Sequence, residues 1–263
     1  MIVRRNSAPY YCTFASMPKF AHDTIVPFKN SELSKKQQVA AMFDKIAFRY
    51  DFLNRFLSFG IDVSWRKKAI KQLQASQPKF ILDVATGTGD VAILAEKMLK
   101  PIKITGIDIS EGMLDIGRKK LEKLDLQNKV ELLTGDSETM NFADNSFDAV
   151  TVAFGVRNFQ NLEKGLTEML RVLKPGGKLV VLEFSRPKQF VFKTIYNLYM
   201  KTIAPGFGKL IAKNKDAYQY LNESVQKFPE GTDFIKILNK AGYKSTYYKT
   251  LTLGICSVYC GSK

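Results

Sequence analysis

The chain of 263 residues is predicted to fold as an α/β domain with a doubly wound, mostly parallel sheet. Between residues 80 and 184, apolar runs of strand length alternate with segments of helical periodicity, which predicts parallel strands joined by helices. Runs such as Leu179–Leu182 are continuously apolar, as expected for strands that are buried on both faces. A glycine-rich turn follows the first run and opens directly into a helical segment, which indicates a ligand site.

Two helices are expected before the sheet. The first covers Ser34–Asp51, and the second runs from about Val63 to Gln74. The first segment places five apolar or aromatic side chains on one helical stripe: Val39, Met42, Phe43, Ile46 and Tyr50.

The alternating region predicts five strands and three helices. The strands are expected near residues 80–85, 103–108, 130–134, 148–154 and 178–184. The helices are expected near residues 90–99, 111–125 and 161–173. Ser110 and Asn161 are the expected N-caps of the last two helices.

The alternation ends after the fifth strand. Residues 187–230 form a long insertion, rich in aromatic and basic side chains, that is expected to be a helical lid on the substrate side. A helix is expected at Thr232–Asn239. Two alternating stretches, residues 243–249 and 252–259, could pair as a hairpin about Thr250 and add an antiparallel edge to the sheet.

A single domain is expected over residues 34–263, with residues 34–79 as an N-terminal helical cap. The length suits one large α/β domain, and a hydrophobic content of 45% is ample for its core. Residues 1–33 are interpreted as a poorly structured tail. The first 22 residues carry three basic side chains and no acidic one, which slightly resembles a mitochondrial transit peptide, but a clear amphipathic arginine pattern is missing. The start of the tail is therefore expected to be dispensable, with Met17 as an alternative first residue.

The cysteines indicate a reducing compartment. Three of them, Cys12, Cys256 and Cys260, are too few for a disulfide framework. Cys256 and Cys260 could bind a metal only with further ligands, and the single histidine, His22, is distant in sequence. We interpret both thiols as small hydrophobes on a C-terminal strand and predict no metal site. No run of about 18 uncharged apolar residues is present, so no membrane span is predicted.

The net charge of +15 is unevenly distributed. Residues 1–79 contain 14 basic and 5 acidic side chains, and residues 185–263 contain 13 and 4, whereas the middle of the chain is slightly acidic. Basic flanks of this kind fit nucleic acid, anionic lipid or an acidic partner. A plainly solvated, lysine-rich surface explains them equally well.

The glycine-rich turn predicts a site for a cofactor that contains a nucleoside. Gly87 and Gly89 allow the backbone to approach a ligand closely, and the helix that follows points free N–H groups at the same place. Asp108 closes the next strand about 20 residues later, the spacing at which a carboxylate reaches the hydroxyls of a ribose.

Three further features favour S-adenosylmethionine over a nicotinamide. Asp83 precedes the glycines, where it can face an amino group of the ligand, and Asp136 follows the third strand, near the expected adenine edge. The segment Arg171–Gly177 joins a helix to a strand through a proline and two glycines. Each feature also has a structural explanation, since Asp83 could cap a helix and Asp136 could hold a turn.

These motifs resemble those of class I S-adenosylmethionine-dependent methyltransferases. The chain is similar in particular to the C-methyltransferases of menaquinone and ubiquinone biosynthesis, over roughly residues 35–260. The segments that carry this more specific similarity are Tyr50-Asp51-Phe-Leu-Asn54, Ser58-Phe-Gly-Ile61, Trp65-Arg66, Phe154-Gly-Val-Arg157-Asn158 and Leu182-Glu-Phe-Ser185.

The resemblance implies a Rossmann-like fold with S-adenosylmethionine as methyl donor. Thr88 and Asp108 match positions that contact the cofactor, with Asp108 on the ribose. Asp136 and Ser137 match the pair near the adenine. A serine that the family carries just before the Phe-Gly of strand four is Ala153 in this chain, so the contact of that hydroxyl is absent.

The implied reaction is the C-methylation of a demethylated polyprenyl quinol, most closely demethylmenaquinol. The ring carbon becomes nucleophilic when a quinol hydroxyl loses its proton, so a base is useful. Tyr50 and Asp51 are the candidates for contact with that hydroxyl, directly or through a water. Asp51 could instead simply pair with Arg49 or Arg55. Arg157 is a poor base because its pKa is above about 12, but its guanidinium suits a developing phenolate.

A polyprenyl quinol lies in the bilayer, so the basic flanks and the aromatic insertion are interpreted as surfaces that contact the membrane. The expected location is the cytoplasm, with peripheral contact to anionic lipid on the inner face of the cytoplasmic membrane. Lys193, Lys201 and Lys209 recur among apolar residues of the insertion, and a lid with lysines directed at water is the alternative.

Other functions remain open. A ubiquinone-pathway benzoquinol methyltransferase is the nearest alternative, but the segment before Tyr50 resembles bacterial menaquinone-pathway enzymes more closely. An RNA methyltransferase would be expected to carry a binding module or a Pro-Pro-Tyr motif near strand four. This chain has Phe154-Gly-Val-Arg157-Asn158 at that position, so no nucleic acid partner is expected. A non-catalytic cofactor-binding subunit and a nicotinamide oxidoreductase are more distant alternatives. The sequence does not indicate the oligomeric state.

Overall fold

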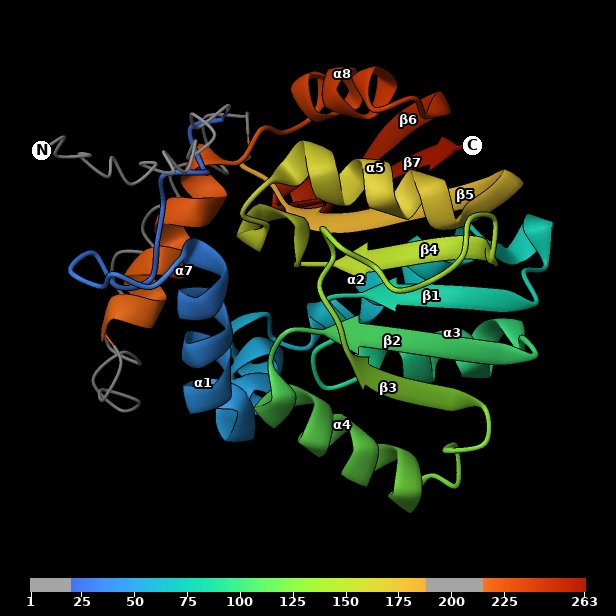
Figure 1. Cartoon of the computed structure of the whole chain (residues 1–263), viewed down its shortest axis with the longest axis horizontal. Coiled ribbons are helices and arrows are strands. Elements are labelled where there is room, and N and C mark those ends of the chain that lie inside the picture. Colours follow the sequence, from blue (N-terminus) through green and yellow to red (C-terminus); the bar gives the residue numbers. More distant parts are fainter. Residues whose placement is uncertain (1–19, 188–214) are drawn as a thin grey trace, which may run out of the picture.

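The computed structural model describes residues 20–187 and 215–263, whose strands form one seven-stranded sheet in the order β3-β2-β1-β4-β5-β7-β6 (Figure 1). β7 (Cys256–Ser262) lies antiparallel between β5 and β6 (Lys244–Leu251). The other five strands are parallel: β1 (Phe80–Val84), β2 (Lys103–Asp108), β3 (Val130–Thr134), β4 (Phe147–Ala153) and β5 (Leu173–Phe184). The predicted doubly wound, mostly parallel sheet is therefore confirmed.

Helices cover both faces of this sheet. On one face, α2 (Ile61–Lys71), α3 (Asp90–Leu99) and α4 (Glu111–Lys123) bury their apolar sides against the strands. On the other face lie α5 (Leu162–Val172) and α8 (Thr232–Lys240). Strand order reverses between β1 and β4, and ligands of open α/β sheets bind beside such a reversal, outside the carboxyl ends of the strands.

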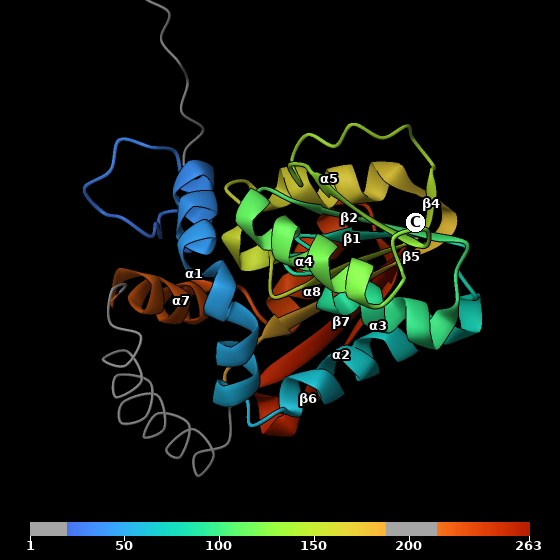
Figure 2. The same ribbon diagram turned by 90° about the horizontal axis from the view of Figure 1, so that it is seen from below.

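Two further helices, α1 (Lys35–Leu57) and α7 (Lys215–Lys227), lie side by side at the carboxyl ends of the parallel strands (Figures 1 and 2). Val39 and Met42 of α1 pack with Tyr220 of α7 in a separate apolar cluster. α1 begins with a capping box, in which Ser34 and Gln37 satisfy each other's backbone N–H groups. α1 therefore lies over the edge where a ligand is expected.

α1 is longer than expected, since the sequence predicted its end at Asp51. The apolar stripe that predicted this helix ends at Tyr50. The phenylalanines beyond Tyr50 are exposed, so they do not continue the stripe. The helix stops only where Phe59 (φ 52°) and Gly60 (φ 76°) both take left-handed backbone conformations.

The turns at the C-terminal edge differ slightly from the prediction. The hairpin of β6 and β7 turns at Thr252–Gly254 and not about Thr250. β5 starts at Leu173, earlier than expected, because Phe147 and Ala149 of β4 pair with Leu173 and Lys178, and the residues between bulge out of the ladder. The proline and glycines of this segment thus make a bulge after the end of α5.

Residues 20–33 contain turns but no helix or strand. His22 is nevertheless fully buried, and its carbonyl accepts a hydrogen bond from the Lys35 ammonium at 2.8 Å. The domain boundaries proposed from the sequence stay a prediction. Within residues 20–187 and 215–263, no helix is both long and apolar enough to cross a bilayer. The same residues contain no group of three or more histidine, cysteine or acidic side chains placed to hold a metal ion.

Candidate active site

A cavity opens at the carboxyl ends of the strands, beneath α1. Four parallel strands deliver the loops that line it, and α1 supplies its outer wall. Its lining includes five residues that the sequence predicted for the site: Tyr50, Gly87, Asp108, Asp136 and Ser137. The structure thus brings together residues that are up to 87 positions apart in the chain.

The glycine loop after β1 takes the shape that its sequence requires. Gly87 (φ 56°) and Gly89 (φ 77°) both have left-handed backbone conformations, in which a side chain would be strained. The Gly87 N–H donates to the Asp108 carboxylate at 2.8 Å. Gly117 of α4 allows close packing beneath the loop, since a Cβ there would lie 3.1 Å from the backbone of Thr88. The sequence did not single out Gly117.

Asp108 is fixed in orientation at the end of β2. Its second carboxylate oxygen accepts the Ser110 N–H at 2.9 Å. Burial raises the pKa of Asp108, although these backbone donors work in the opposite direction. Each carboxylate oxygen retains a second lone pair, so the group can still accept hydroxyl donors from a ligand.

Asp83 lies beneath the glycine loop and does not line the cavity. Its two oxygens accept hydrogen bonds from the hydroxyls of Thr86 and Thr151, each at 2.6 Å. Burial raises the pKa of Asp83 to about 6, while the two hydroxyls oppose that rise. These contacts show Asp83 supporting the loop, and its predicted contact with the ligand stays a prediction.

A lysine that the sequence analysis did not identify reaches the predicted adenine side of the cavity. The Lys36 ammonium, in the first turn of α1, pairs with Asp136 and also contacts Glu138 at 3.2 Å. Burial works to lower the pKa of Lys36, but the two carboxylates outweigh it and raise that pKa. Asp136 in turn accepts the Glu138 N–H at 2.9 Å. The start of α1 is therefore attached to the loop after β3.

Tyr50 also lines the cavity, about four turns further along α1 than Lys36. Its ring packs edge-on against Phe43, with ring centroids 5.7 Å apart. Burial raises the pKa of the Tyr50 hydroxyl, and the charges of Arg157 and Arg66 partly offset this. Both guanidinium groups therefore act electrostatically on this end of the cavity.

Arg157 does not line the cavity but forms a buried ion pair beside it. Its guanidinium donates to Glu183 and to the carbonyl of Phe154, each at 2.6 Å, and lies 5.4 Å from the centre of the Phe184 ring. Both partners are almost fully buried, at 3% exposed for Arg157 and 0% for Glu183. Burial raises the pKa of Glu183, against the opposing effect of the arginine. The sequence predicted Arg157 but not its partner.

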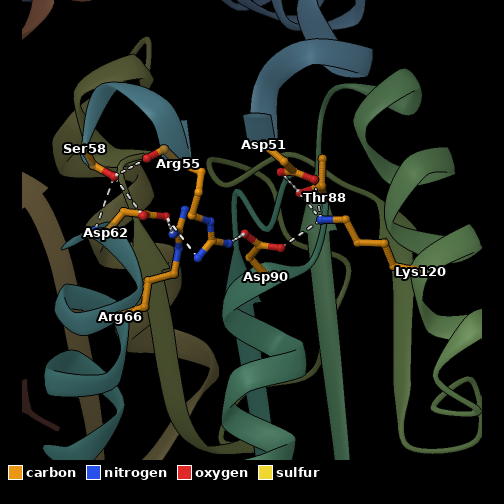
Figure 3. A network of polar contacts seen from close by, with 8 residues as sticks. All are labelled: Asp51, Arg55, Ser58, Asp62, Arg66, Thr88, Asp90 and Lys120. Atoms are coloured by element: carbon orange, nitrogen blue, oxygen red, sulfur yellow. Dashed lines mark hydrogen bonds and ion pairs between the residues drawn. The ribbon is translucent and has the colours of Figure 1, made fainter. Parts of the chain in front are cut away.

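Asp51 belongs to a network of charges outside the cavity (Figure 3). It accepts a hydrogen bond from the Thr88 hydroxyl at 2.6 Å and pairs with the Lys120 ammonium at 2.5 Å. Lys120, from α4, also donates to Thr88 and to Asp90, each at 2.8 Å. One ammonium group thus joins α1, the glycine loop and the first residue of α3. Asp51 pairs with this lysine and not with Arg49 or Arg55, the neighbours that the sequence suggested.

The network continues from Asp90 toward α2. Arg55 lies 3.6 Å from Asp90 and 4.0 Å from Asp62, and Arg66 pairs with Asp62 (Figure 3). Ser58 donates a further hydrogen bond to Asp62 at 2.8 Å. The C-terminal half of α1 is therefore held to α2, α3 and α4 by charged groups.

The cavity combines acidic groups at two points with apolar walls. Asp108 and Asp136 can accept hydrogen bonds from the hydroxyl and amino groups of a ligand. Ile109, Met113 and Phe159 also line the cavity and supply apolar surface, as a flat aromatic base would require. The residues present thus fit a nucleoside, with the glycine loop at one end.

Comparisons with known proteins extend this description. A model of the ubiE/COQ5 methyltransferase family matches residues 31–263. A demethylmenaquinone methyltransferase of Bacteroides fragilis is 46% identical over 244 residues, which cover 93% of this chain and 99% of that protein. A ubiquinone/menaquinone biosynthesis C-methyltransferase of Geotalea daltonii is 46% identical over 237 residues, which cover 90% and 100%.

Solved structures share the fold at lower identity. A SAM-dependent methyltransferase of Thermotoga maritima, described as a possible histamine N-methyltransferase, superposes with a TM-score of 0.60 at 21% identity, covering 85% of this chain and 99% of that one. The cyclase SpnF superposes with a TM-score of 0.57 at 16% identity, covering 87% and 96%. Proteins with this fold catalyse different reactions, so the reaction has to be inferred from the residues of the site.

Proposed function

Because this chain belongs to the ubiE/COQ5 methyltransferase family, we propose that it transfers a methyl group from S-adenosylmethionine to a ring carbon of a demethylated polyprenyl quinol. The acceptor that we favour is demethylmenaquinol, since a relative 46% identical to this chain is named for it. The supporting observation in the structure is one cavity that joins the glycine loop, Asp108 and Asp136 to Tyr50.

The cofactor is proposed to lie along the carboxyl ends of the strands. Bound there, S-adenosylmethionine supplies an electrophilic methyl group on its sulfonium. Asp108 is proposed to accept the two ribose hydroxyls, with its orientation fixed by the N–H groups of Gly87 and Ser110. Asp136 and Ser137 are proposed to face the adenine edge. The free N–H groups of the glycine loop are proposed to donate hydrogen bonds to other polar atoms of the cofactor.

The acceptor ring is proposed to lie beside Tyr50. A hydroxyl there would sense the positive charges of Arg157 and Arg66, which favour its phenolate form. A phenolate directs electron density onto the ring carbon and makes it nucleophilic. Arg157 would act through this field from its buried position, and its paired guanidinium is not a proton acceptor. Water is the proposed proton acceptor. Burial raises the pKa of the Tyr50 hydroxyl and keeps it protonated, so Tyr50 would contact the acceptor as a hydrogen-bond donor.

For Asp51, the contacts support a positioning role. The carboxylate is occupied by Thr88 and Lys120, on the outer side of the glycine loop. It would hold Thr88 in place and, through the helix, the adjacent Tyr50. Gly89 and Thr88 would contribute to cofactor binding through the conformation of the loop.

Membrane contact is part of the proposal, because a polyprenyl acceptor is dissolved in lipid. The protein is proposed to work in the cytoplasm, against the inner face of the cytoplasmic membrane. The lysines that the sequence suggested for this contact, Lys193, Lys201 and Lys209, lie outside the described residues.

The proposal is tested by incubating the protein with S-adenosylmethionine labelled in the methyl group. Demethylmenaquinol, a demethylated benzoquinol and bulk RNA are offered in separate reactions. Label is expected in menaquinol. Label in the benzoquinol instead would assign the ubiquinone pathway, which the name of the Geotalea daltonii relative also includes. Label in RNA alone, or in none of the three, would reject the proposed function.

A further inference from the structure

The C-terminal half of α1 exposes large apolar side chains on the side turned away from the cavity. Phe48 is 91% exposed and Phe52 is 68% exposed. At a spacing of four residues they are neighbours on the helix surface. Val39, Phe43 and Tyr50, which line the cavity, fall on the opposite side of the same helix. α1 thus has one apolar side toward the ligand site and another toward solvent.

Two of the exposed rings pack on one another. Phe56, one turn beyond Phe52, stacks on it with ring centroids 5.8 Å apart. We call these three residues, Phe48, Phe52 and Phe56, the aromatic face of α1. Aromatic side chains at successive spacings of four residues share one side of a helix and together form an apolar surface, which a single exposed apolar residue does not.

Two basic side chains border this aromatic face. Lys45 lies three residues before Phe48, Arg49 lies three residues before Phe52, and both basic side chains are exposed. Residues 35–71, which span α1 and α2, contain nine basic and three acidic side chains. A helix with exposed aromatic rings and flanking lysine or arginine has the composition of helices that lie in the headgroup region of a bilayer.

We propose that the aromatic face of α1 is the surface through which the protein docks on an anionic phospholipid bilayer. This inference rests on the proposed function, because it gives the lipid-dissolved acceptor a route to the site. The helix that would lie in the headgroup region also carries Tyr50 into the cavity. A quinol ring would then travel about 10 Å, the width of one helix, between lipid and the site.

Charge favours lipid over other occupants of this face. A second copy of the chain would bring another net charge of +15 toward Lys45 and Arg49, which opposes association. Anionic headgroups gain from the same charges, and the attraction would weaken at high salt. The rings alone would not distinguish these partners.

The experiment is co-sedimentation of the full chain with vesicles of phosphatidylcholine, with and without phosphatidylglycerol. The test variant is Phe48→Ser/Phe52→Ser, and both positions are exposed, so the fold should be unaffected. The matched control is Ile102→Ser, which removes a side chain that is 54% exposed just before β2, at the amino end of the strands. The test variant should bind anionic vesicles at least about tenfold more weakly than the wild type, and the control should bind normally.

Methylation is measured on the same proteins with two acceptors, a quinol without a polyprenyl tail in solution and a polyprenyl quinol in vesicles. The test variant should retain activity on the soluble acceptor and lose it on the vesicle acceptor. The inference is overturned if the wild type does not bind anionic vesicles, or if test and control variants bind equally well. It is also overturned if light scattering shows that the wild type and the control form a dimer and the test variant does not. No activity of the wild type on either acceptor would reject the proposed function and leave the binding result standing.

Discussion

Replacing Arg157 by methionine should destabilise the fold at neutral and higher pH. The change leaves the Glu183 carboxylate fully buried, without the guanidinium that neutralises it at 2.6 Å. Removing one partner of a buried ion pair typically costs about 3–5 kcal/mol, a large share of the stability of a domain. We therefore expect the free energy of unfolding at pH 8 to fall by about that amount.

The pH dependence of this loss has a definite sign. Burial already raises the pKa of Glu183, and without Arg157 that pKa should rise further. A carboxyl whose pKa is higher in the folded than in the unfolded protein destabilises the fold at high pH. This penalty grows as the pH rises from the pKa of the unfolded state to the pKa of the folded state, and it is absent at lower pH. The difference between variant and wild type should therefore be largest at pH 8 and shrink as the pH falls toward 5.

Urea unfolding followed by tryptophan fluorescence would measure this. The single tryptophan, Trp65, is buried with its ring 6.1 Å from that of Phe184, so it reports on the surroundings of the pair. The double variant Arg157→Met/Glu183→Gln should recover most of the stability, because no buried charge is left. A single variant as stable as the wild type at pH 8, or no recovery in the double variant, would refute the reasoning.

The double variant also separates structure from chemistry. If the field of Arg157 favours the phenolate, the double variant should fold, bind S-adenosylmethionine with nearly normal affinity and still transfer methyl groups slowly. Isothermal titration gives the affinity, and labelled product gives the rate. A folded double variant with wild-type turnover would remove Arg157 from the proposed mechanism.

Three further predictions follow from single contacts. Lys120→Met and Asp51→Asn should each weaken S-adenosylmethionine binding. Because the pair is partly exposed, a double-mutant cycle should give a coupling energy of roughly 0.5–1 kcal/mol between the two substitutions. Strictly additive effects would contradict the network. Asp108→Ala should weaken that binding by about 10–100-fold, as expected for lost hydrogen bonds to a carboxylate, and an unchanged affinity would exclude the ribose contact. The pKa of His22 is lowered to about 4, chiefly by burial, so the unfolded protein binds more protons below about pH 6.5 and stability should fall there. The stability difference between wild type and His22→Gln should change by about 3 kcal/mol between pH 6.5 and 4, and a constant difference would mean that His22 titrates normally.

The sheet and the glycine loop could be predicted because their signals are local. Buried parallel strands are continuously apolar, and a close approach of backbone to ligand requires glycine, as at Gly87 and Gly89. Asp108 was predictable for the same reason, since its position follows from the end of β2. Each of these features is specified within a few residues of sequence.

The partners of charged residues could not be predicted, because no periodicity connects them. Lys36 and Asp136 are 100 positions apart, and Arg157 and Glu183 are 26 apart on different elements. Their meeting depends on how α1 lies over the strand ends and on the order of β4 and β5. Asp51 shows the consequence, because the sequence identified the residue but its interaction partners, Lys120 and Thr88, place it outside the cavity.

The attachment of α1 has a consequence for the rate at which ligands enter. The helix closes the outer side of the cavity, and polar pairs fasten it at its first turn, through Lys36, and near its end, through Asp51 and Arg55. Partly exposed ion pairs are screened by salt, whereas apolar contacts are not. Higher ionic strength should therefore lift the helix more often without melting the sheet beneath it. Faster hydrogen exchange of the α1 amides, at unchanged exchange in β1 and β4, would be the signature of such opening.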